Sequence, residues 1–152
     1  MTGFLPEIIE RDYEPGTVLR AFTATEFLAT TFPPREYVIE PAIPTQGLAL
    51  VYAPRGTGKT HVSLGIAYAV ACGGPFLRWT APKPRRTLFV DGEMPGVALQ
   101  ERLANLAANN ELEPPDPGNL KIITPDLQDK SLPDLATPEG QAAIDEHLVD
   151  RV

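Results

Sequence analysis

The apolar positions of this 152-residue chain gather in three short, almost unbroken runs. They cover residues 48–52 (LALVY), 87–91 (TLFVD) and 120–124 (LKIIT). Short continuous apolar runs are typical of strands that are covered on both faces, as in a parallel sheet. The pattern therefore predicts three buried strands, and the first of them suits a central position in the sheet.

The segments between these runs carry helical signals. Residues 58–72 are apolar almost all round, which predicts a helix buried against the sheet. Residues 95–110 place leucines at helical spacing and predict an amphipathic helix. A last helix is expected to start at Pro138, with Thr137 as its N-cap, and to run to about residue 150. Strands and helices alternate, so the fold class is α/β.

The first 45 residues have a different character. They are rich in proline and show no sustained periodicity, which predicts an irregular lead-in to the domain. Thr23 and Glu26 have the spacing of a capping box and predict a short helix, and residues 37–39 are a candidate short strand. The expected organisation is a lead-in over residues 1–45 and an α/β domain over residues 46–152.

Composition narrows the class of protein. A hydrophobic content of 43% favours a folded globular domain. The net charge of −7 gives no overall electrostatic attraction for nucleic acid or an anionic membrane. The single cysteine, Cys72, lies in an apolar helix and is interpreted as a small buried hydrophobe in a reducing cytoplasm. No apolar run approaches the length of a membrane span, and the acidic N-terminus does not resemble a signal segment.

A glycine-rich turn joins the first predicted strand to the first predicted helix. It reads APRGTGKT over residues 53–60. Gly56 and Gly58 let the backbone fold tightly, so that successive N–H groups converge on phosphate oxygens, and the helix N-terminus adds its positive dipole end. Lys59 is placed to reach the β- and γ-phosphates, and the Thr60 hydroxyl to ligate Mg²⁺. The turn therefore predicts a P-loop that binds a nucleoside triphosphate.

The loop departs from the usual pattern at its first position, where Ala53 stands in place of glycine. The alternative interpretation is a glycine-rich strand-to-helix turn with a solvated lysine. The predicted strand and helix on its two sides favour the P-loop. The candidate nucleotide-binding residues are Pro54, Arg55, Gly56, Thr57, Gly58, Lys59, Thr60 and His61.

Two carboxylates follow the second predicted strand. Asp91 and Glu93 belong to the segment DGEMP, in which Gly92 is expected to allow a sharp turn. Ligands of parallel α/β sheets lie outside the carboxyl ends of the strands, so both acids are expected on the same edge as the P-loop. Glu93 is the candidate catalytic residue that activates a water aimed at the γ-phosphate, with Lys59 as the second catalytic residue. Asp91 is a candidate magnesium ligand beside Thr60.

The alternative for these acids is that they only favour the helix N-terminus electrostatically. Two other groups of residues are given no site. Residues 76–86 carry four basic side chains beside Phe76 and Trp79, and they are interpreted as a solvated basic loop whose aromatics pack on the domain. His61 and His147 belong to no zinc-like spacing.

The order of these segments resembles the first part of a RecA-like ATPase core. The segments are, in order, a strand, APRGTGKT, an apolar helix, TLFVDGEMPGVALQERL, LKIITPD and TPEGQAAIDEHL. It is most similar to the RepA-like replicative helicases of plasmids and mobile elements, often called AAA-family ATPases. The resemblance implies a three-layer P-loop NTPase core with a parallel sheet. It also implies ATP and Mg²⁺ as cofactors, Glu93 as the water-activating glutamate, a homo-oligomeric ring and action on single-stranded DNA.

The family pattern continues with another apolar strand that ends in the Walker B aspartate. The sequence stops at Val152 before such a strand, so the expectation is a core incomplete at its C-terminus, from a truncated or split coding sequence. Two alternatives stay open. Asp91 could itself be the Walker B residue of a small-molecule P-loop kinase, or the chain could be a degenerate module that binds ATP without turnover.

Overall fold

A computed structural model describes residues 19–109 and 113–148 of the chain. The chain divides into two compact units, Met1–Arg35 and Glu36–Val152. Each unit is described by itself. In the described ranges no helix is both long enough and apolar enough to cross a membrane.

The described part of the first unit, residues 19–35, contains one short helix, α1 (Ala24–Ala29). The predicted capping box is confirmed, because the Thr23 amide donates to Glu26 Oε2 at 2.8 Å and the Glu26 amide donates to Thr23 Oγ1 at 3.3 Å. The Thr23 hydroxyl also donates to Glu26 Oε2, at 2.7 Å, and the hydrogen bonds from the Thr23 amide and then the Thr23 hydroxyl hold the pKa of the Glu26 carboxyl below its usual range. None of the helix residues is buried, so the helix is stabilised by its N-terminal capping box and not by packing in a core.

The second unit contains two small antiparallel pairs of strands, one before and one after helix α2 (Lys59–Cys72). The strands β1 (Tyr37–Ile39) and β2 (Ile43–Pro44) form the first pair, and β3 (Pro75–Phe76) and β4 (Trp79–Thr80) form the second. The predicted strand at residues 37–39 is therefore confirmed. The two pairs meet around a small apolar cluster whose buried members are Ile39, Val70 and Ala81.

The main sheet consists of two parallel strands, β5 (Thr87–Val90) and β6 (Leu120–Ile123). Their register pairs Thr87 with Leu120 and Val90 with Ile123. The second and third predicted strands are thus confirmed. Every residue of β5 is half-buried, so the sheet is covered less completely than the unbroken apolar run predicts.

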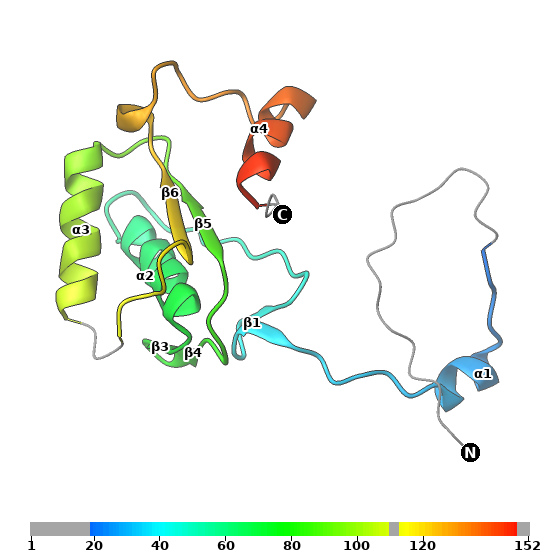
Figure 1. Cartoon of the computed structure of the whole chain (residues 1–152). Coiled ribbons are helices and arrows are strands. Elements are labelled where there is room, and N and C mark those ends of the chain that lie inside the picture. Colours follow the sequence, from blue (N-terminus) through cyan, green and yellow to red (C-terminus); the bar gives the residue numbers. More distant parts are fainter. Residues whose placement is uncertain (1–18, 110–112, 149–152) are drawn as a thin grey trace. The chain divides into compact units, whose positions relative to one another are not determined.

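Helix α2 (Lys59–Cys72) packs against this sheet, as predicted from its apolar surface. Leu64 and Ala69 are completely buried, and the Asn119 side chain donates to the Ala71 carbonyl at 3.3 Å, which ties the helix to the start of β6. Cys72 is half-buried, and burial raises the pKa of its thiol. In Figure 1, α2 runs along the back of the two strands.

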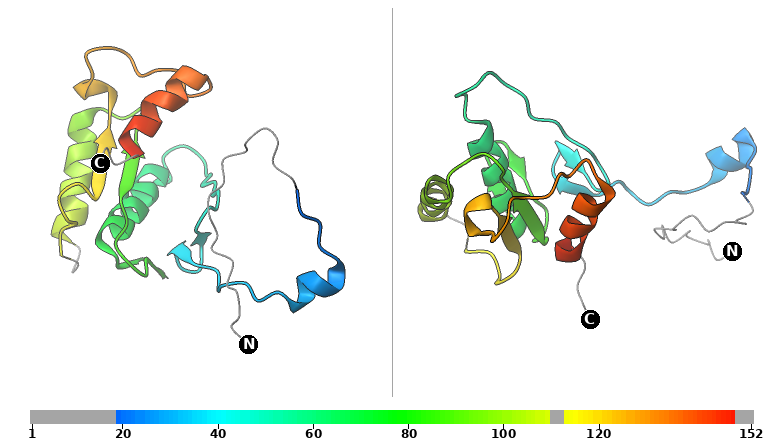
Figure 2. Two further views of the ribbon diagram at one scale, coloured as in Figure 1. Left: turned by 45° about the vertical axis from the view of Figure 1, so that its right-hand side comes forward. Right: turned by 90° about the horizontal axis from the view of Figure 1, so that it is seen from above.

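Helices α3 (Gly96–Ala108) and α4 (Pro138–Leu148) complete the second unit. The start of α3 is held by Asp126 in the short 3₁₀ helix η1 (Pro125–Leu127), whose carboxylate accepts from the Gly96 amide at 2.6 Å. Helix α4 begins as predicted, with the Gly140 amide donating to Thr137 Oγ1 at 3.1 Å. Helices α2 and α4 lie on opposite sides of β5 (Figure 2).

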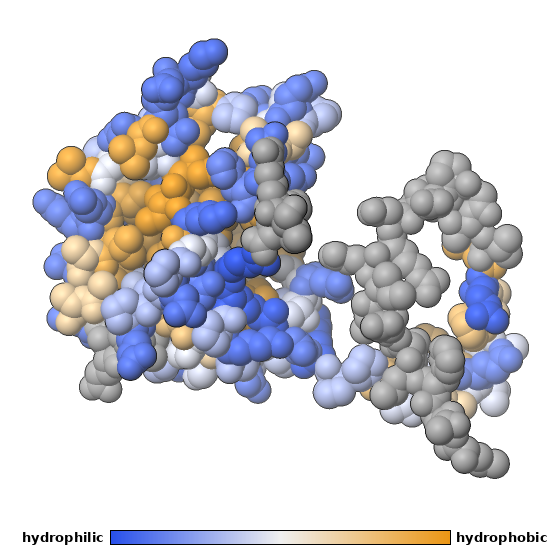
Figure 3. All heavy atoms as spheres, in the orientation of Figure 1, coloured by the Kyte–Doolittle hydropathy of each residue, from blue (hydrophilic) through white to orange (hydrophobic). Residues whose placement is uncertain are grey.

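Apolar side chains remain visible on the face of the sheet turned away from α2. Figure 3 shows them gathered between α3 and α4. A cavity of about 530 Å³ opens there between Val90 at the end of β5 and Ile144 of α4, lined also by Leu132 and Leu135. Helix α4 therefore covers this face only in part.

The prediction of a central strand at residues 48–52 is wrong in this structure. The segment forms no strand, and Leu48 and Leu50 are 102% and 85% exposed. A strand exists only where a neighbouring backbone accepts its hydrogen bonds, and no described segment pairs with this one. An apolar run signals a preference for burial, but it does not supply the neighbour.

Candidate active site

Two residues of the glycine loop adopt backbone angles that only glycine takes up easily. Gly56 and Gly58 have φ angles of 84° and 92°, in the left-handed region that favours glycine. A β-carbon built on either residue meets nothing within 4 Å. The two glycines are therefore needed for their backbone angles and not for lack of space.

Helix α2 starts directly at this loop, with Gly58 as an N-cap that has no side chain to offer. The Val62 amide makes the first hydrogen bond of the helix, to the Gly58 carbonyl at 3.0 Å. The amides of Lys59, Thr60 and His61 precede it and have no acceptor within the helix. These N–H groups and the helix dipole make the start of α2 suitable for an anion.

The Lys59 ammonium group is fixed at the mouth of the loop. It donates to the carbonyls of Ala53 at 2.8 Å and Pro54 at 3.1 Å, and the Thr57 hydroxyl donates to the same Pro54 carbonyl at 2.8 Å. A lysine has three donors, so two hold the loop closed and one is left for a ligand oxygen. Lys59 thereby stabilises the loop and supplies it with positive charge.

The loop and the turn after β5 face one cavity of about 650 Å³. From the loop and the start of α2 it is lined by Arg55, Gly56, Gly58, Lys59 and Thr60. From the end of β5, the turn beyond it and α3 it is lined by Val90, Asp91, Gly92, Glu93, Met94 and Arg102. The structure thus brings together the residues that were predicted to meet at one edge of the sheet.

Three of the candidate nucleotide-binding residues do not line this cavity. Pro54 and Thr57 act within the loop through the hydrogen bonds to the Pro54 carbonyl. The His61 side chain lies against a different hollow, beside Phe76 and Leu106. The contribution of His61 to a phosphate site is therefore limited to its backbone amide.

Asp91 shapes the turn that carries Glu93. Its Oδ1 atom accepts from the amides of Glu93 at 2.9 Å and Met94 at 2.7 Å. Gly92, between Asp91 and Glu93, is not in the left-handed region, and a β-carbon there meets nothing within 4 Å, so neither its φ angle nor lack of space requires glycine at this position. The carboxylate of Asp91 therefore stabilises the turn.

The oxygen donors of this cavity suit magnesium. The Thr60 hydroxyl and the carboxylates of Asp91 and Glu93 are hard ligands of the kind that Mg²⁺ prefers. Across the described residues there is no group of three or more His, Cys, Asp or Glu side chains arranged to hold a metal.

Arg102 is the charged residue of this cavity that was not among the residues predicted for the site. On the sequence it belongs to the polar face of an amphipathic helix, outside the leucine stripe. Its position three residues after Leu99 and four before Leu106 puts it on the flank of that stripe, which was the available signal.

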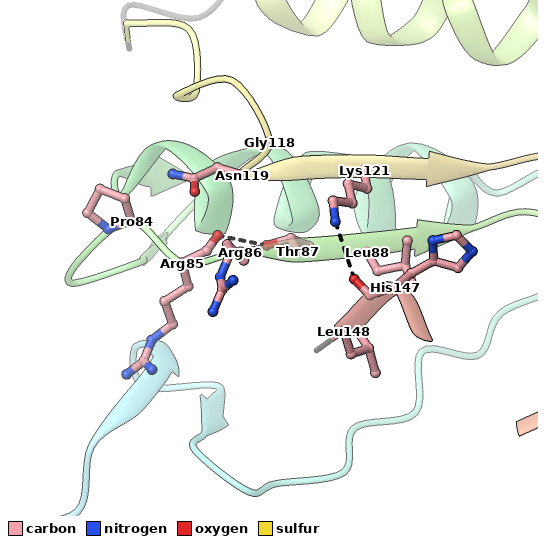
Figure 4. Close-up of a pocket in the computed structure, with 10 residues that line it drawn as sticks. All are labelled: Pro84, Arg85, Arg86, Thr87, Leu88, Gly118, Asn119, Lys121, His147 and Leu148. Carbon is pink, nitrogen blue, oxygen red and sulfur yellow. Dashed lines mark hydrogen bonds between the residues drawn. The ribbon is translucent and has the colours of Figure 1, made fainter. Parts of the chain in front are cut away.

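The basic connection at residues 76–86 lies at the other end of the strands. Lys83 and Arg85 both pair with Glu36, at 3.2 Å and 3.0 Å, and these partners, Lys83 first, hold the pKa of the Glu36 carboxyl below its usual range. A hollow of about 560 Å³ opens nearby, where Lys121 donates to the His147 carbonyl at 3.4 Å (Figure 4). Because these groups flank the amino ends of β5 and β6, they form no part of the loop cavity.

Comparison of the sequence with known families identifies the family of the chain. A family model described as an AAA domain matches residues 14–152. The chain belongs to the AAA family. AAA domains are P-loop ATPases, so membership supports an α/β P-loop fold, nucleotide binding and the use of Mg²⁺ by this AAA domain. A search of curated proteins found no match to the chain.

Proposed function

We propose that residues 46–152 of this AAA domain form the ATP-binding segment of a RecA-like, RepA-like ATPase. In its intact form the protein couples ATP hydrolysis to action on single-stranded DNA, as a homo-oligomeric ring in the cytoplasm, during replication of a plasmid or mobile element. The nucleotide part of this proposal is argued from the cavity. The DNA, ring and replication parts rest on the sequence resemblance.

One observation carries the nucleotide part: the glycine loop and the turn after β5 face the same cavity. The loop amides and Lys59 would hold the phosphates, and Thr60 would ligate Mg²⁺, which supplies charge neutralisation at the β- and γ-phosphates. Glu93 lines the same cavity as Lys59, on an exposed turn, where its carboxylate can accept a proton from a water. This arrangement suits phosphoryl transfer to water.

The test is nucleotide binding and turnover by the 152-residue chain, with the fluorescent analogue mant-ATP and Mg²⁺. We expect saturable binding that Lys59→Ala weakens by at least about tenfold, since the substitution removes one of the charged donors of the loop. We expect Glu93→Gln to bind as the wild type does and to lose turnover. Hydrolysis at the wild-type rate by Glu93→Gln would refute the role given to Glu93.

A small-molecule kinase that uses Asp91 as its Walker B residue is the second candidate. The observation in its favour is that Asp91 lines the cavity and keeps its Oδ2 atom out of the two turn hydrogen bonds. Stimulation of turnover by single-stranded DNA would favour the helicase-like ATPase. Phosphate transfer to a small hydroxyl-bearing acceptor would favour the kinase, and tight binding with no turnover a degenerate module.

A further inference from the structure

The hollow at the amino ends of β5 and β6, here called the amino-end hollow, shares no lining residue with the loop cavity. It has a volume of about 560 Å³. The two strands start together here, since Thr87 pairs with Leu120 and the Thr87 amide donates to the Asn119 carbonyl at 2.7 Å. The end of α4 forms one side of the hollow, where Lys121 donates to the His147 carbonyl (Figure 4).

The amino-end hollow is positively charged, although the whole chain carries a net charge of −7. Its described lining residues include no carboxylate and three cations, Arg85, Arg86 and Lys121. The parallel register sets Leu88 opposite Lys121, and residues paired in this way share a face of the sheet. Arg86 lies two residues before Leu88, so the alternation of the strand puts Arg86 and Lys121 on the same face. Figure 4 shows both side chains extending to the side on which α4 ends.

Arg85 is fixed in place beside these two cations. Its amide donates to the Val70 carbonyl at 2.9 Å, and its Nη2 atom donates to Glu36 at 3.0 Å. Its Nε atom is buried and has no hydrogen-bond partner among the described residues. The Arg85 side chain is 27% exposed and that of Lys83 is 56% exposed, so Lys83 is the more solvated of the two. Because both cations share the single carboxylate of Glu36, this group of three keeps a positive charge.

The chemistry of these groups suits a phosphate. Lys121 has three donors and uses one on the His147 carbonyl, so two remain for a ligand. The arginine fork matches two phosphate oxygens, and the lysine ammonium adds a point charge. Leu88 and Leu148 add an apolar wall, and small-molecule sites combine such a wall with a few polar groups. The volume lies within the range of those sites, roughly 300–1,000 Å³, so there is room for the group that carries the phosphate.

We propose that the amino-end hollow binds a phosphate group, which Lys121 and Arg86 hold from their shared face while Arg85 adds charge beside them. The phosphate belongs either to a phosphorylated small molecule or to the backbone of a single-stranded nucleic acid, since both present the same oxygens to these side chains. The site lies at the opposite ends of the strands from the loop cavity and goes beyond the function proposed for that cavity.

Residue-resolved NMR of the 152-residue chain, titrated with inorganic phosphate, tests the site. We expect saturable shifts of the amide resonances of Arg86, Gly118 and Lys121. Lys121→Gln should weaken phosphate by about fivefold or more, because it keeps a donor for the His147 carbonyl but loses one charge-assisted contact. Lys121→Arg keeps the charge and should stay within about twofold of wild type. The matched control is Lys83→Ala, which removes an equal charge from a residue outside the lining and should change the affinity by less than about twofold.

Binding of a fluorescein-labelled oligothymidine identifies the source of the phosphate. If the ligand is a nucleic-acid backbone, oligothymidine binds more tightly than inorganic phosphate does. Lys121→Gln then lowers the slope of log affinity against log salt by about 0.7, the value for one phosphate contact with a single strand. If the ligand is a small molecule, Lys121→Gln weakens inorganic phosphate and leaves oligothymidine unchanged. Either result supports the site and assigns its ligand.

Two outcomes would overturn the inference. One is an equal weakening of phosphate by Lys121→Gln and Lys83→Ala, which would mean that phosphate responds only to the diffuse charge of this face. The other is the absence of saturable shifts at residues 86, 118 and 121, with or without shifts in the glycine loop at residues 56–61. A failure of the loop cavity to bind mant-ATP leaves the expected result at the amino-end hollow unchanged, so the two proposals are tested independently.

Discussion

The role of Asp91 separates two descriptions of this site, and two substitutions at that position test them. Asp91→Asn removes the charge but keeps an oxygen that can accept from the amides of Glu93 and Met94. Asp91→Ala removes the acceptor. In the structure both hydrogen bonds go to Oδ1, at 2.9 Å and 2.7 Å, which makes the shape of the turn the first role of this side chain.

The magnitude follows from the exposure of the two amides. A hydrogen bond to a charged group contributes about 1.5–3 kcal/mol, but water can replace the acceptor at an exposed donor. Glu93 is exposed and Met94 is half-buried, so Asp91→Ala leaves one amide that water reaches poorly. We expect it to cost about 1–2 kcal/mol in the free energy of unfolding. Asp91→Asn should cost less than about 1 kcal/mol, because both bonds persist without the charge.

Urea unfolding measures these costs, and a magnesium titration of mant-ATP binding measures the other role. If Asp91 mainly shapes the turn, Asp91→Asn leaves the Mg²⁺ concentration at half-saturation within about threefold of wild type, a difference below about 1 kcal/mol. If Asp91 is a magnesium ligand, both variants raise that concentration by about tenfold or more, since a carboxylate ligand is lost in each. The second result, with stability unchanged in Asp91→Asn, would refute the structural reading.

Two further predictions concern the loop and the basic connection. Gly58→Ala should lower the free energy of unfolding by about 1–2 kcal/mol in thermal or urea unfolding, because it places a residue with a β-carbon at a φ of 92°. The added carbon has no neighbour within 4 Å, so the cost comes from the backbone conformation and not from a clash. A loss of stability below about 0.3 kcal/mol would show that the loop can leave this conformation at little cost. The pKa of Glu36 is lowered by Lys83 and Arg85, so its stabilising contribution is complete above its unfolded pKa and disappears as the pH falls through its folded pKa. Wild type should therefore lose more stability than Glu36→Gln between about pH 5 and pH 3, and parallel curves would contradict the pairing.

The sequence predicted those parts of the fold that depend on nearby residues. The capping box at Thr23, the start of α4 after Thr137 and the extent of α2 each follow from a few consecutive side chains. The strands β5 and β6 were also predicted, because an apolar run met a neighbour in parallel register. The caps and α2 depend only on local sequence, whereas β5 and β6 also needed each other as partners.

Where the prediction failed, the structure depends on contacts with other parts of the chain, which the local pattern of residues does not reveal. Residues 48–52 have the composition of a buried strand, but no described backbone pairs with them. In the site, Asp91 was read as a magnesium ligand or a helix-start charge, and its hydrogen bonds to the turn amides were missed because they depend on the local path of the backbone. Arg102 was missed because helix periodicity predicts which side of the helix a residue lies on, but not which part of the domain that side faces.

The two halves of the candidate site are supported by different parts of the structure. Gly58 and the start of α2 are built from local backbone conformation, and they form although residues 48–52 join no strand. The turn at Asp91 and Glu93 connects β5 to α3, and Asp126 fixes the start of α3 by accepting a hydrogen bond from the Gly96 amide. The packing of α2 against β5 is what connects the halves. The costs in unfolding free energy of one substitution in the loop and one in the turn should therefore add, because the two segments share no direct contact network. Both substitutions should weaken the affinity for a nucleotide that spans the cavity, since such a ligand couples the two segments.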